Sequence, residues 1–189
     1  MVIVLTITAF VCSAALGLVY SVTKEPIAEA KIARINASIA VVVPPFDNNP
    51  SENPIEVEVD GRIMRLYVAK KGDEVIGVAV ESFSNMGFSG LITLMVGFLP
   101  DGTINDIAVL AHNETPGLGD KMEKRKDERF AVQFDGQHPN NFRLALRKDG
   151  GDVDVITAAT ITSRAFIDAV RRAFEVFEEN KQSWEIPQS

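Results

Sequence analysis

The first twenty residues restrict what this chain can fold into more than any other segment. Residues 2–20, VIVLTITAFVCSAALGLVY, carry no charged side chain, and a helix needs about 20 apolar residues to cross the hydrocarbon layer of a membrane. A cleaved signal peptide usually has a shorter apolar core, roughly 7 to 15 residues, that follows positive charge. No positive side chain precedes this run. The sequence therefore predicts a retained transmembrane anchor over residues 1–22, with a signal peptide and a buried core helix as alternatives.

The charges that follow the anchor bear on its orientation. Lys24, Lys31 and Arg34 come directly after the apolar run, and positive charge favours the cytoplasmic side of a membrane. This pattern would place the bulk of the chain in the cytoplasm. The acidic residues Glu25 and Glu29 lie among these charges and dilute the signal.

Composition excludes several classes of function. The formal net charge is −7, which argues against a nucleic-acid partner because such proteins usually present a basic face. With Cys12 as the one cysteine, no internal disulfide can form and no zinc site can rest on thiolates. The two histidines, His112 and His138, are too few and too far apart in the sequence for a histidine-rich cluster. We therefore expect no metal site.

The segment after the anchor, residues 23–54, is expected to be a juxtamembrane helix and linker. Ile32, Ile35, Ile39 and Val42 recur at spacings of three and four, which predicts a helix with one apolar stripe. Pro44 and Pro45 follow, and proline ends helices because it lacks the backbone N–H. The sequence DNNPSENP at residues 47–54 indicates a polar loop.

From residue 55 to residue 189 the pattern predicts an α+β domain, a mostly antiparallel sheet followed by a C-terminal helix. Alternating or apolar runs separated by turn signals indicate strands. The expected strands are IEVEV, RIMRLYVAK, EVIGVAVE, LITLMVGFL, TINDIAVLAH and FRLALR, with turns at DG, KKGD, PDGT and KDGGD.

An apolar stripe of Phe166, Val170, Phe174 and Phe177 predicts the C-terminal helix. The helix is expected to begin near Thr162 or Ser163, because either hydroxyl could cap the first turn. Its solvent-facing side is assigned to the charged residues Asp168, Arg171, Arg172, Glu175, Glu178 and Glu179.

A run of small and hydroxyl-bearing residues, DVITAATITSR at residues 154–164, leads into this helix. The first turn of a helix presents unpaired N–H groups and a partial positive charge, which suit a phosphate. Small side chains at Ala158 and Ala159 would let a ligand approach the backbone. Hydroxyls come from Thr157, Thr160, Thr162 and Ser163. The alternative is an ordinary helix start without a ligand.

This segment resembles the flavinylation motif of FMN-binding domains, in which an acid, two residues, Ser or Thr, and Gly or Ala precede Ala-Thr. The loop HNETPGLG at residues 112–119 is similar to the loop that faces the flavin in that family, and GFSG at residues 87–90 is a looser match. Together with the anchor, these motifs resemble the G subunits of Rnf complexes, membrane-bound ferredoxin:NAD oxidoreductases. The resemblance covers nearly the whole chain, although the family most often has glycine where this chain has Ala158.

The resemblance implies roles for individual residues. A flavin transferase would join the phosphate of FMN to the hydroxyl of Thr160, and Asp154 would be read by that transferase or serve only as a turn acid. Thr157 would bond the phosphate or the turn, and Phe88 would lie near the flavin ring or in the core. Glu114 would line the ring or pair with Lys121 or Arg125, and His112 would anchor its loop rather than donate a proton. The expected cofactor-binding residues are Thr160, Asp154, Thr157, Ala158, Ala159, Thr162, Ser163, Glu114, Thr115, Gly117 and Leu118.

The resemblance also implies an assembly. The chain would be an electron carrier without an active site of its own, in contact with the bilayer through residues 2–22 and with the other subunits of a complex that translocates sodium or protons. Its soluble domain would face the extracytoplasmic side of the inner membrane, against the charge pattern after the anchor. Three other interpretations stay open, namely the C subunit of the sodium-translocating NADH:quinone reductase, a flavinylated domain of another electron-transfer chain, and an anchored scaffold without flavin.

Overall fold

The computed structural model describes residues 1–184, without the side chains of residues 28, 29 and 31. The last five residues of the expected domain and the charges of Glu29 and Lys31 therefore lie outside the described part. The chain divides into two compact units, Met1–Asn36 and the part from Ala37 onward. Each unit is described by itself.

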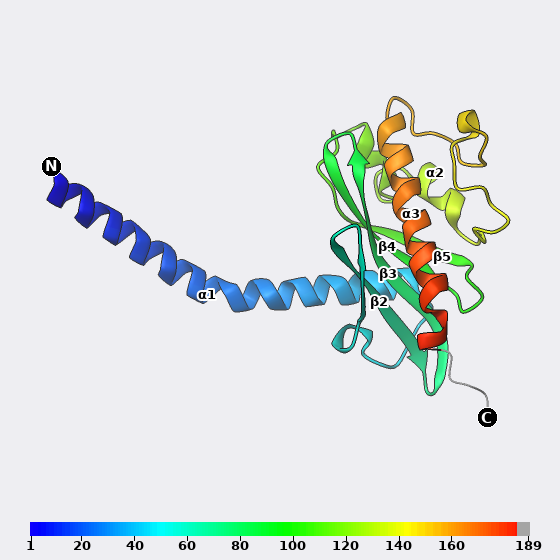
Figure 1. Cartoon of the computed structure of the whole chain (residues 1–189), viewed down its shortest axis with the longest axis horizontal. Coiled ribbons are helices and arrows are strands. Elements are labelled where there is room, and N and C mark those ends of the chain that lie inside the picture. Colours follow the sequence, from blue (N-terminus) through cyan, green and yellow to red (C-terminus); the bar gives the residue numbers. More distant parts are fainter. Residues whose placement is uncertain (185–189) are drawn as a thin grey trace. The chain divides into compact units, whose positions relative to one another are not determined.

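The first unit is part of one continuous helix, α1, which spans Val2–Val42 (Figure 1). Its most apolar window has a mean hydropathy of 2.5. Among the described residues, α1 is the helix that is long and apolar enough to cross a membrane. Pro26 lies within it.

The second unit contains a five-stranded antiparallel sheet in which each strand pairs with the next along the chain. This order is a simple meander, as the alternating pattern predicts. The strands are β1 (Ile55–Val59), β2 (Arg62–Lys71), β3 (Glu74–Gly87), β4 (Gly90–Phe98) and β5 (Ile104–Ala111).

Short turns join these strands. The β1–β2 turn has positive φ at both central residues, 50° at Asp60 and 73° at Gly61, which is the geometry that matches the twist of paired strands. Gly72 and Gly102 take positive φ in the next two predicted turns. The turn signals in the sequence therefore placed these strand ends correctly.

Helix α3 (Thr160–Asn180) packs across β3 and β4 (Figure 1). Its phenylalanines and alanines bury against the sheet, and Trp184 closes this cluster at 6% exposure. The shorter helical segments are α2 (Glu128–Ala131), η1 (Pro50–Glu52), η2 (Gly119–Met122), η3 (Val132–Phe134), η4 (Arg147–Asp149) and η5 (Lys181–Ser183).

The end of α1 docks on the sheet within the second unit. Ile39 and Val42 are fully buried, and Asn105 Nδ2 donates to the carbonyl oxygen of Val42 at 2.8 Å. A side chain at Gly97 would bring its Cβ to 1.9 Å from that same oxygen. Gly97 is therefore needed for this close approach.

Two expectations were wrong here, the strand at FRLALR and the solvent-facing position of Asp168. FRLALR does not form a strand, because the segment folds back on itself. Leu146 makes a single bridge to Val153, and the backbone N–H of Arg143 donates to Asp152 Oδ2 at 2.8 Å. Asp168 does not face solvent but is 4% exposed, since it accepts hydrogen bonds from the Ser84 hydroxyl at 2.8 Å and from Arg172 Nε at 3.0 Å.

Candidate functional site

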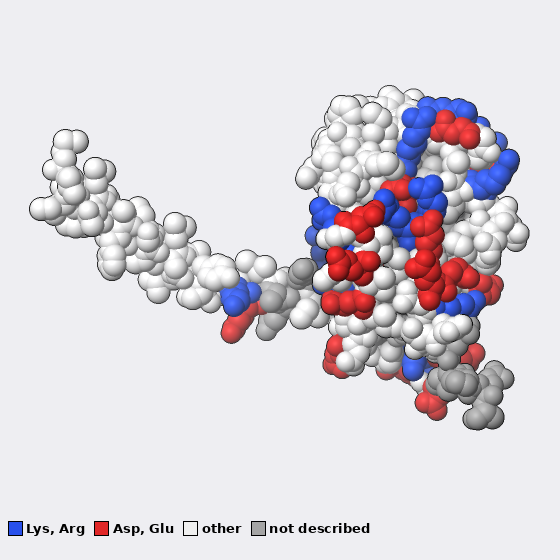
Figure 2. All heavy atoms as spheres, in the orientation of Figure 1, with Lys and Arg blue, Asp and Glu red and all other residues white. Residues whose placement is uncertain are grey.

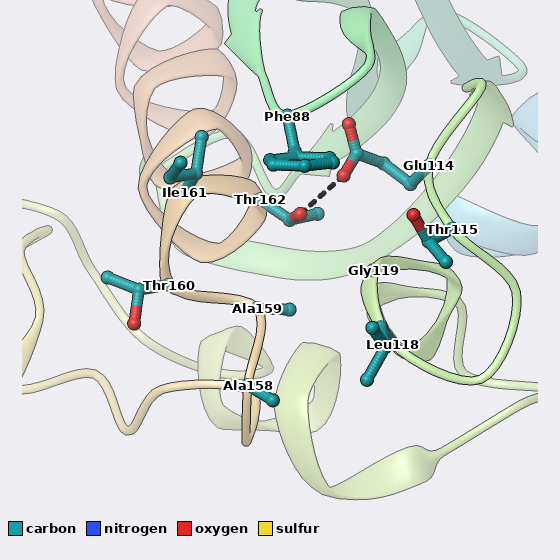
Figure 3. A pocket seen from close by; sticks show the side chains of 10 residues that line it. All are labelled: Phe88, Glu114, Thr115, Leu118, Gly119, Ala158, Ala159, Thr160, Ile161 and Thr162. Carbon is teal, nitrogen blue, oxygen red and sulfur yellow. Dashed lines mark hydrogen bonds between the residues drawn. The ribbon is translucent and has the colours of Figure 1, made fainter.

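A cavity of about 320 Å³ opens where the β3–β4 hairpin, the 112–119 loop and the start of α3 meet (Figure 3). In this close view, Phe88 lies on one side of the space, and Leu118 and Ala158 lie on the other. Phe88 is 67% exposed, so the alternative in which it serves the core was wrong. The lining residues are Phe88, Glu114, Thr115, Leu118, Gly119, Ala158, Ala159, Thr160, Ile161 and Thr162.

Glu114 is the buried carboxylate of this cavity, at 5% exposure. One carboxylate oxygen accepts from the backbone N–H of Ser89 at 2.9 Å, and the other accepts a short hydrogen bond from the Thr162 hydroxyl. A buried carboxylate needs such donors, because a buried polar group left without a partner costs about 1–3 kcal/mol and a charged one costs more. Glu114 thus links the hairpin to α3. The alternative, in which Glu114 pairs with Lys121 or Arg125, was wrong.

His112 holds the loop that carries Glu114. Its Nδ1 accepts from the backbone N–H of Glu114 at 3.0 Å, which leaves the proton on Nε2, 2.8 Å from Glu123 Oε1. Burial alone would raise the pKa of Glu123, but hydrogen bonds from Arg125 and His112 outweigh it and hold that pKa below its usual range. The contacts of His112 fit a loop-anchoring role.

The turn that leads into α3 contains an unusual backbone conformation. Ala158 has φ of 62°, in the left-handed region that costs a residue with a Cβ roughly 1–2 kcal/mol. This explains why a glycine is common at this position in the flavinylation motif that the segment resembles. The alanine therefore keeps the turn but strains it.

The helix begins earlier than the hydroxyls suggest. The N-cap position belongs to Ala159, whose side chain offers no cap, and the helix starts at Thr160. The expectation that Thr162 or Ser163 caps the helix was therefore wrong. The hydroxyl of Ser163 accepts from the backbone N–H of Ile156 at 3.0 Å and donates to the Ala159 carbonyl at 2.9 Å. It closes the turn from inside, away from the cavity.

Thr160 stands at the rim of the cavity, in the first position of α3. Figure 3 shows its hydroxyl directed away from the Glu114–Thr162 pair, on the outer side of the turn. Lys148, from η4, donates from Nζ to this hydroxyl at 3.2 Å. The first turn of a helix also leaves backbone N–H groups without intrahelical partners. A negative group on this oxygen would meet both a cation and the positive end of a helix.

Two of the motif residues face a different hollow. Asp154 and Thr157 line a second cavity of about 280 Å³, together with Arg129 and Gln133. Asp154 pairs with Arg147 Nε at 2.9 Å, and its backbone N–H donates to the Gln133 side chain at 2.7 Å. In the same hollow, hydrogen bonds from Arg129 lower the pKa of Asp127 to about 2.

The structure thus gathers most of the residues expected from the sequence, but not all of them, around one cavity. Glu114, Thr115, Leu118, Ala158, Ala159, Thr160 and Thr162 line it, whereas Asp154, Thr157, Gly117 and Ser163 do not. Sequence reasoning missed Ile161 and Lys148. Ile161 reads as an ordinary helix residue, and the separation of Lys148 from Thr160 carries no periodic signal that would join them.

The cavity suits a flat, largely apolar ring with a phosphorylated tail. Small-molecule pockets measure roughly 300–1,000 Å³ and combine apolar walls with a few polar groups. Here Phe88 and Leu118 supply apolar walls, Glu114 supplies a fixed hydrogen-bond acceptor, and Thr160 lies at the rim beside Lys148. FMN has this combination of an isoalloxazine ring and a phosphate, so the residues present fit it.

Comparison with known proteins first gives the class of domain. The profile of the FMN-binding domain family matches residues 87–175, the span that contains the whole cavity.

Relatives over the full length then give the particular family, the G subunits of ion-translocating oxidoreductase complexes. The chain is 34% identical to the G subunit of Shewanella amazonensis over 186 residues, which is 93% of this chain and 86% of the relative. The G subunit of Vibrio cholerae is 32% identical over 189 residues, 95% of this chain and 90% of the relative. That of Pasteurella multocida is 37% identical over 180 residues, 90% of this chain and 89% of the relative. The chain belongs to this family.

Proposed function

We propose that this chain is a membrane-anchored electron carrier that holds FMN covalently, through a phosphoester to Thr160. The observation that carries this proposal is the placement of the Thr160 hydroxyl. It lies at the rim of the cavity that the FMN-binding family match covers, at the start of a helix and beside a lysine. A tail attached at this oxygen would leave the ring free to enter the space between Phe88 and Leu118.

Bound there, the flavin would supply electron transfer, and the protein would set its position and potential. The residues that would hold it differ in role. Phe88 and Leu118 would cover the two sides of the ring, Glu114 would offer its fixed oxygens to ring N–H groups, and the small residues Ala158 and Ala159 would keep the backbone accessible.

Formation of the bond requires help from outside the chain. The Thr160 oxygen would form a bond to the phosphorus of a flavin nucleotide whose phosphate is activated as an anhydride, and the anhydride bond would break to release the other phosphate. A threonine hydroxyl needs a base to attack. No carboxylate or histidine donates or accepts a hydrogen bond at this hydroxyl among the described residues, so the transferase would take the proton.

Asp154 and Thr157 would act in recognition rather than in holding the ring. Both line the second hollow, on the other side of the turn that ends at Thr160. A transferase could contact this hollow while the flavin enters the first cavity. In this assignment the transferase would recognise Asp154 and Thr157 at the start of the motif. The flavin would be held at the end of the motif, at Ala158, Ala159 and Thr160.

The anchor and the assembly complete the proposal. Helix α1 would cross the inner membrane once, and the domain would lie on the extracytoplasmic side, in contact with the other subunits of an Rnf complex. The relatives are parts of ion-translocating oxidoreductase complexes by name, and we propose ferredoxin and NAD as the ends of the electron path. Protease digestion of right-side-out and inside-out vesicles tests the orientation, with digestion expected only in the former.

Fluorescence of the denatured chain in a gel tests the function. Wild-type protein from cells that contain the flavin transferase should give a yellow-green band, because a covalent flavin survives denaturation. The band should vanish in Thr160→Ala, return in Thr160→Ser, and persist in the control Thr103→Ala, which alters a threonine in the β4–β5 turn. A dark wild-type band would favour the anchored scaffold, and a bright Thr160→Ala band would move the attachment elsewhere.

A further inference from the structure

The segment that precedes α3, residues 143–159, carries many charged side chains. Figure 2 shows basic and acidic atoms gathered over this segment and along α3, whereas the neighbouring end of the β3–β4 hairpin shows none on this face. Two arginines of this segment and one in the first turns of α3 form ion pairs with carboxylates. They are Arg143 with Asp152 at 2.8 Å, Arg147 with Asp154 at 2.9 Å, and Arg164 with Asp149 at 2.9 Å.

Lys148 differs from these arginines. The hydrogen bond that its Nζ makes goes to the Thr160 hydroxyl, at 3.2 Å. Holding a long side chain against a neutral hydroxyl at an exposed site costs side-chain entropy and gains little. The stability of the folded chain alone is therefore a poor explanation for the hydrogen bond between Lys148 and Thr160.

The backbone around Lys148 is fixed in a way that maintains this contact. The carboxylate of Asp149 accepts hydrogen bonds from both Nε and Nη2 of Arg164, at 2.9 and 3.0 Å. Arg164 lies four residues after Thr160, and such residues share a helix face. The ion pair therefore holds η4 against the face of α3 that carries the Thr160 hydroxyl. Gly150, at φ of 87°, ends η4 and turns the chain back.

We propose that Lys148 pairs with the phosphoryl group on Thr160, and that this pairing speeds attachment of the flavin. The inference rests on the proposed function. Once Oγ1 carries a phosphoryl group, negatively charged oxygens lie two bonds from the atom that Lys148 already contacts. The Lys148 ammonium, which donates to a neutral hydroxyl in the free chain, then donates to an oxygen of opposite charge, and such hydrogen bonds are among the shorter and stronger ones. Lys148 keeps its protons throughout, and the proton of Thr160 leaves with the base of the transferase.

The nearby arginines cannot take over this role without breaking their own pairs. Arg147, the neighbour of Lys148, is held by Asp154, and Arg164 is held by Asp149 from two nitrogens. Among the described residues, loss of the Lys148 charge should therefore leave the helix N-terminus as the remaining positive partner of the attached phosphate. This makes a single substitution informative.

The first experiment measures the rate of flavin attachment by intact mass. Purified full-length chain in detergent is mixed with the transferase and its flavin nucleotide donor. Lys148→Met keeps most of the aliphatic side chain and removes the charge, and it should load about tenfold more slowly. Lys148→Arg should load within about twofold of wild type, because guanidinium also pairs with phosphate. The matched control Lys71→Met changes an exposed lysine at the end of β2, before the β2–β3 turn, and should load normally.

The second experiment needs no variant. Acetylation of lysines by an activated ester, read by peptide mass, compares the flavin-free and flavin-loaded wild-type chain. Pairing with a phosphoryl group should slow acetylation of Lys148 severalfold and leave Lys71 unchanged. Because the chain is wild type in both samples, a folding defect cannot produce this difference.

The outcomes separate this inference from the proposed function. If wild-type protein takes up no flavin, the result contradicts both the covalent flavin and the pairing of Lys148 with its phosphoryl group. If wild type loads while Lys148→Met loads at the same rate and acetylation of Lys148 does not change, the Lys148 pairing falls and the covalent flavin stands. Slow loading of Lys148→Met that Lys148→Arg does not rescue would also overturn the pairing, because it would point to side-chain shape rather than charge.

Discussion

Two segments bound the cavity, and they are held in different ways. The ring-side loop, residues 112–122, is fixed by the buried carboxylate of Glu114, which joins the β3–β4 hairpin to α3. The attachment-side segment, residues 143–160, is fixed by ion pairs whose arginines are at least half exposed.

The difference indicates a division of labour. Exposed ion pairs contribute little to stability, whereas leaving the partners of a buried carboxylate unpaired is costly. The wall that would meet the flavin ring is therefore expected to be rigid in the free chain. The segment that carries the attachment threonine is expected to yield, which would let a transferase reach Thr160.

The largest effect should come from the ring-side loop. Glu114→Ala leaves the N–H of Ser89 and the hydroxyl of Thr162 without their partner, and we expect a loss of about 2–4 kcal/mol in the free energy of unfolding. Denaturant unfolding of the flavin-free chain in detergent, followed by fluorescence of the single tryptophan, Trp184, measures it. Glu58→Ala, at an exposed position of strand β1, is the control and should change little. Equal effects of both substitutions would contradict a rigid ring-side loop.

A smaller loss should follow from crowding the same loop. A Cβ at Gly119 would lie 2.7 Å from both Cβ and Oε2 of Glu114. Gly119→Ala is therefore expected to cost about 1–3 kcal/mol, as overpacked cores do. The same unfolding measurement applies. A cost below about 0.5 kcal/mol would show that the loop shifts freely, and the contrast between the two segments would disappear.

On the attachment side, one substitution should stabilise the chain. Ala158→Gly relieves the left-handed backbone, and after the entropy cost of glycine we expect a gain of about 0.5–1 kcal/mol. Ala159→Gly is the matched control, since Ala159 has φ of −133° and is buried, and it should destabilise. A loss of stability in Ala158→Gly would contradict the strain that we assign to this turn.

The smallest effect on the free energy of unfolding should come from loss of the ion pair between Asp149 and Arg164. The hydrogen bond from Arg164 lowers the pKa of Asp149, so the pair contributes above the ordinary carboxyl range and is lost as pH falls through that lowered value. The difference in unfolding between wild type and Asp149→Asn should be small at neutral pH, shrink with salt and vanish in acid. A difference that grows toward low pH would contradict this account.

The strands and turns of the second unit were predictable because local signals decide them. Residue pairs such as Asp60-Gly61 permit few backbone shapes, and the apolar stripe of α3 needs only helical periodicity. The FRLALR segment alternates like a strand, yet it folds back through Asp152 and finds no partner strand. Alternation indicates that a segment can pair and says nothing of whether a neighbour is available.

The site was predictable only in part, for a related reason. The resemblance to a known motif pointed to Thr160 and to the loop that holds Glu114. One partner of Glu114 is Thr162, 48 residues away, and no sequence spacing indicates which acid becomes buried. Asp168 shows the same limit, since helical periodicity assigns it to the charged face of α3, but it is buried and bonded to Ser84 and Arg172. Lys148 lies beside Thr160 where the neighbouring ion pair between Asp149 and Arg164 joins η4 to α3, and no sequence spacing indicates this pairing.

Peptide-level mass analysis of the full-length chain, purified from cells that contain the flavin transferase, tests the central claim most directly. The account predicts that the peptide with Thr160 gains the mass of a single phosphoester-linked FMN, with fragment ions that place it on that residue. The same peptide found unmodified, in protein from a host that flavinylates related domains, would contradict the account.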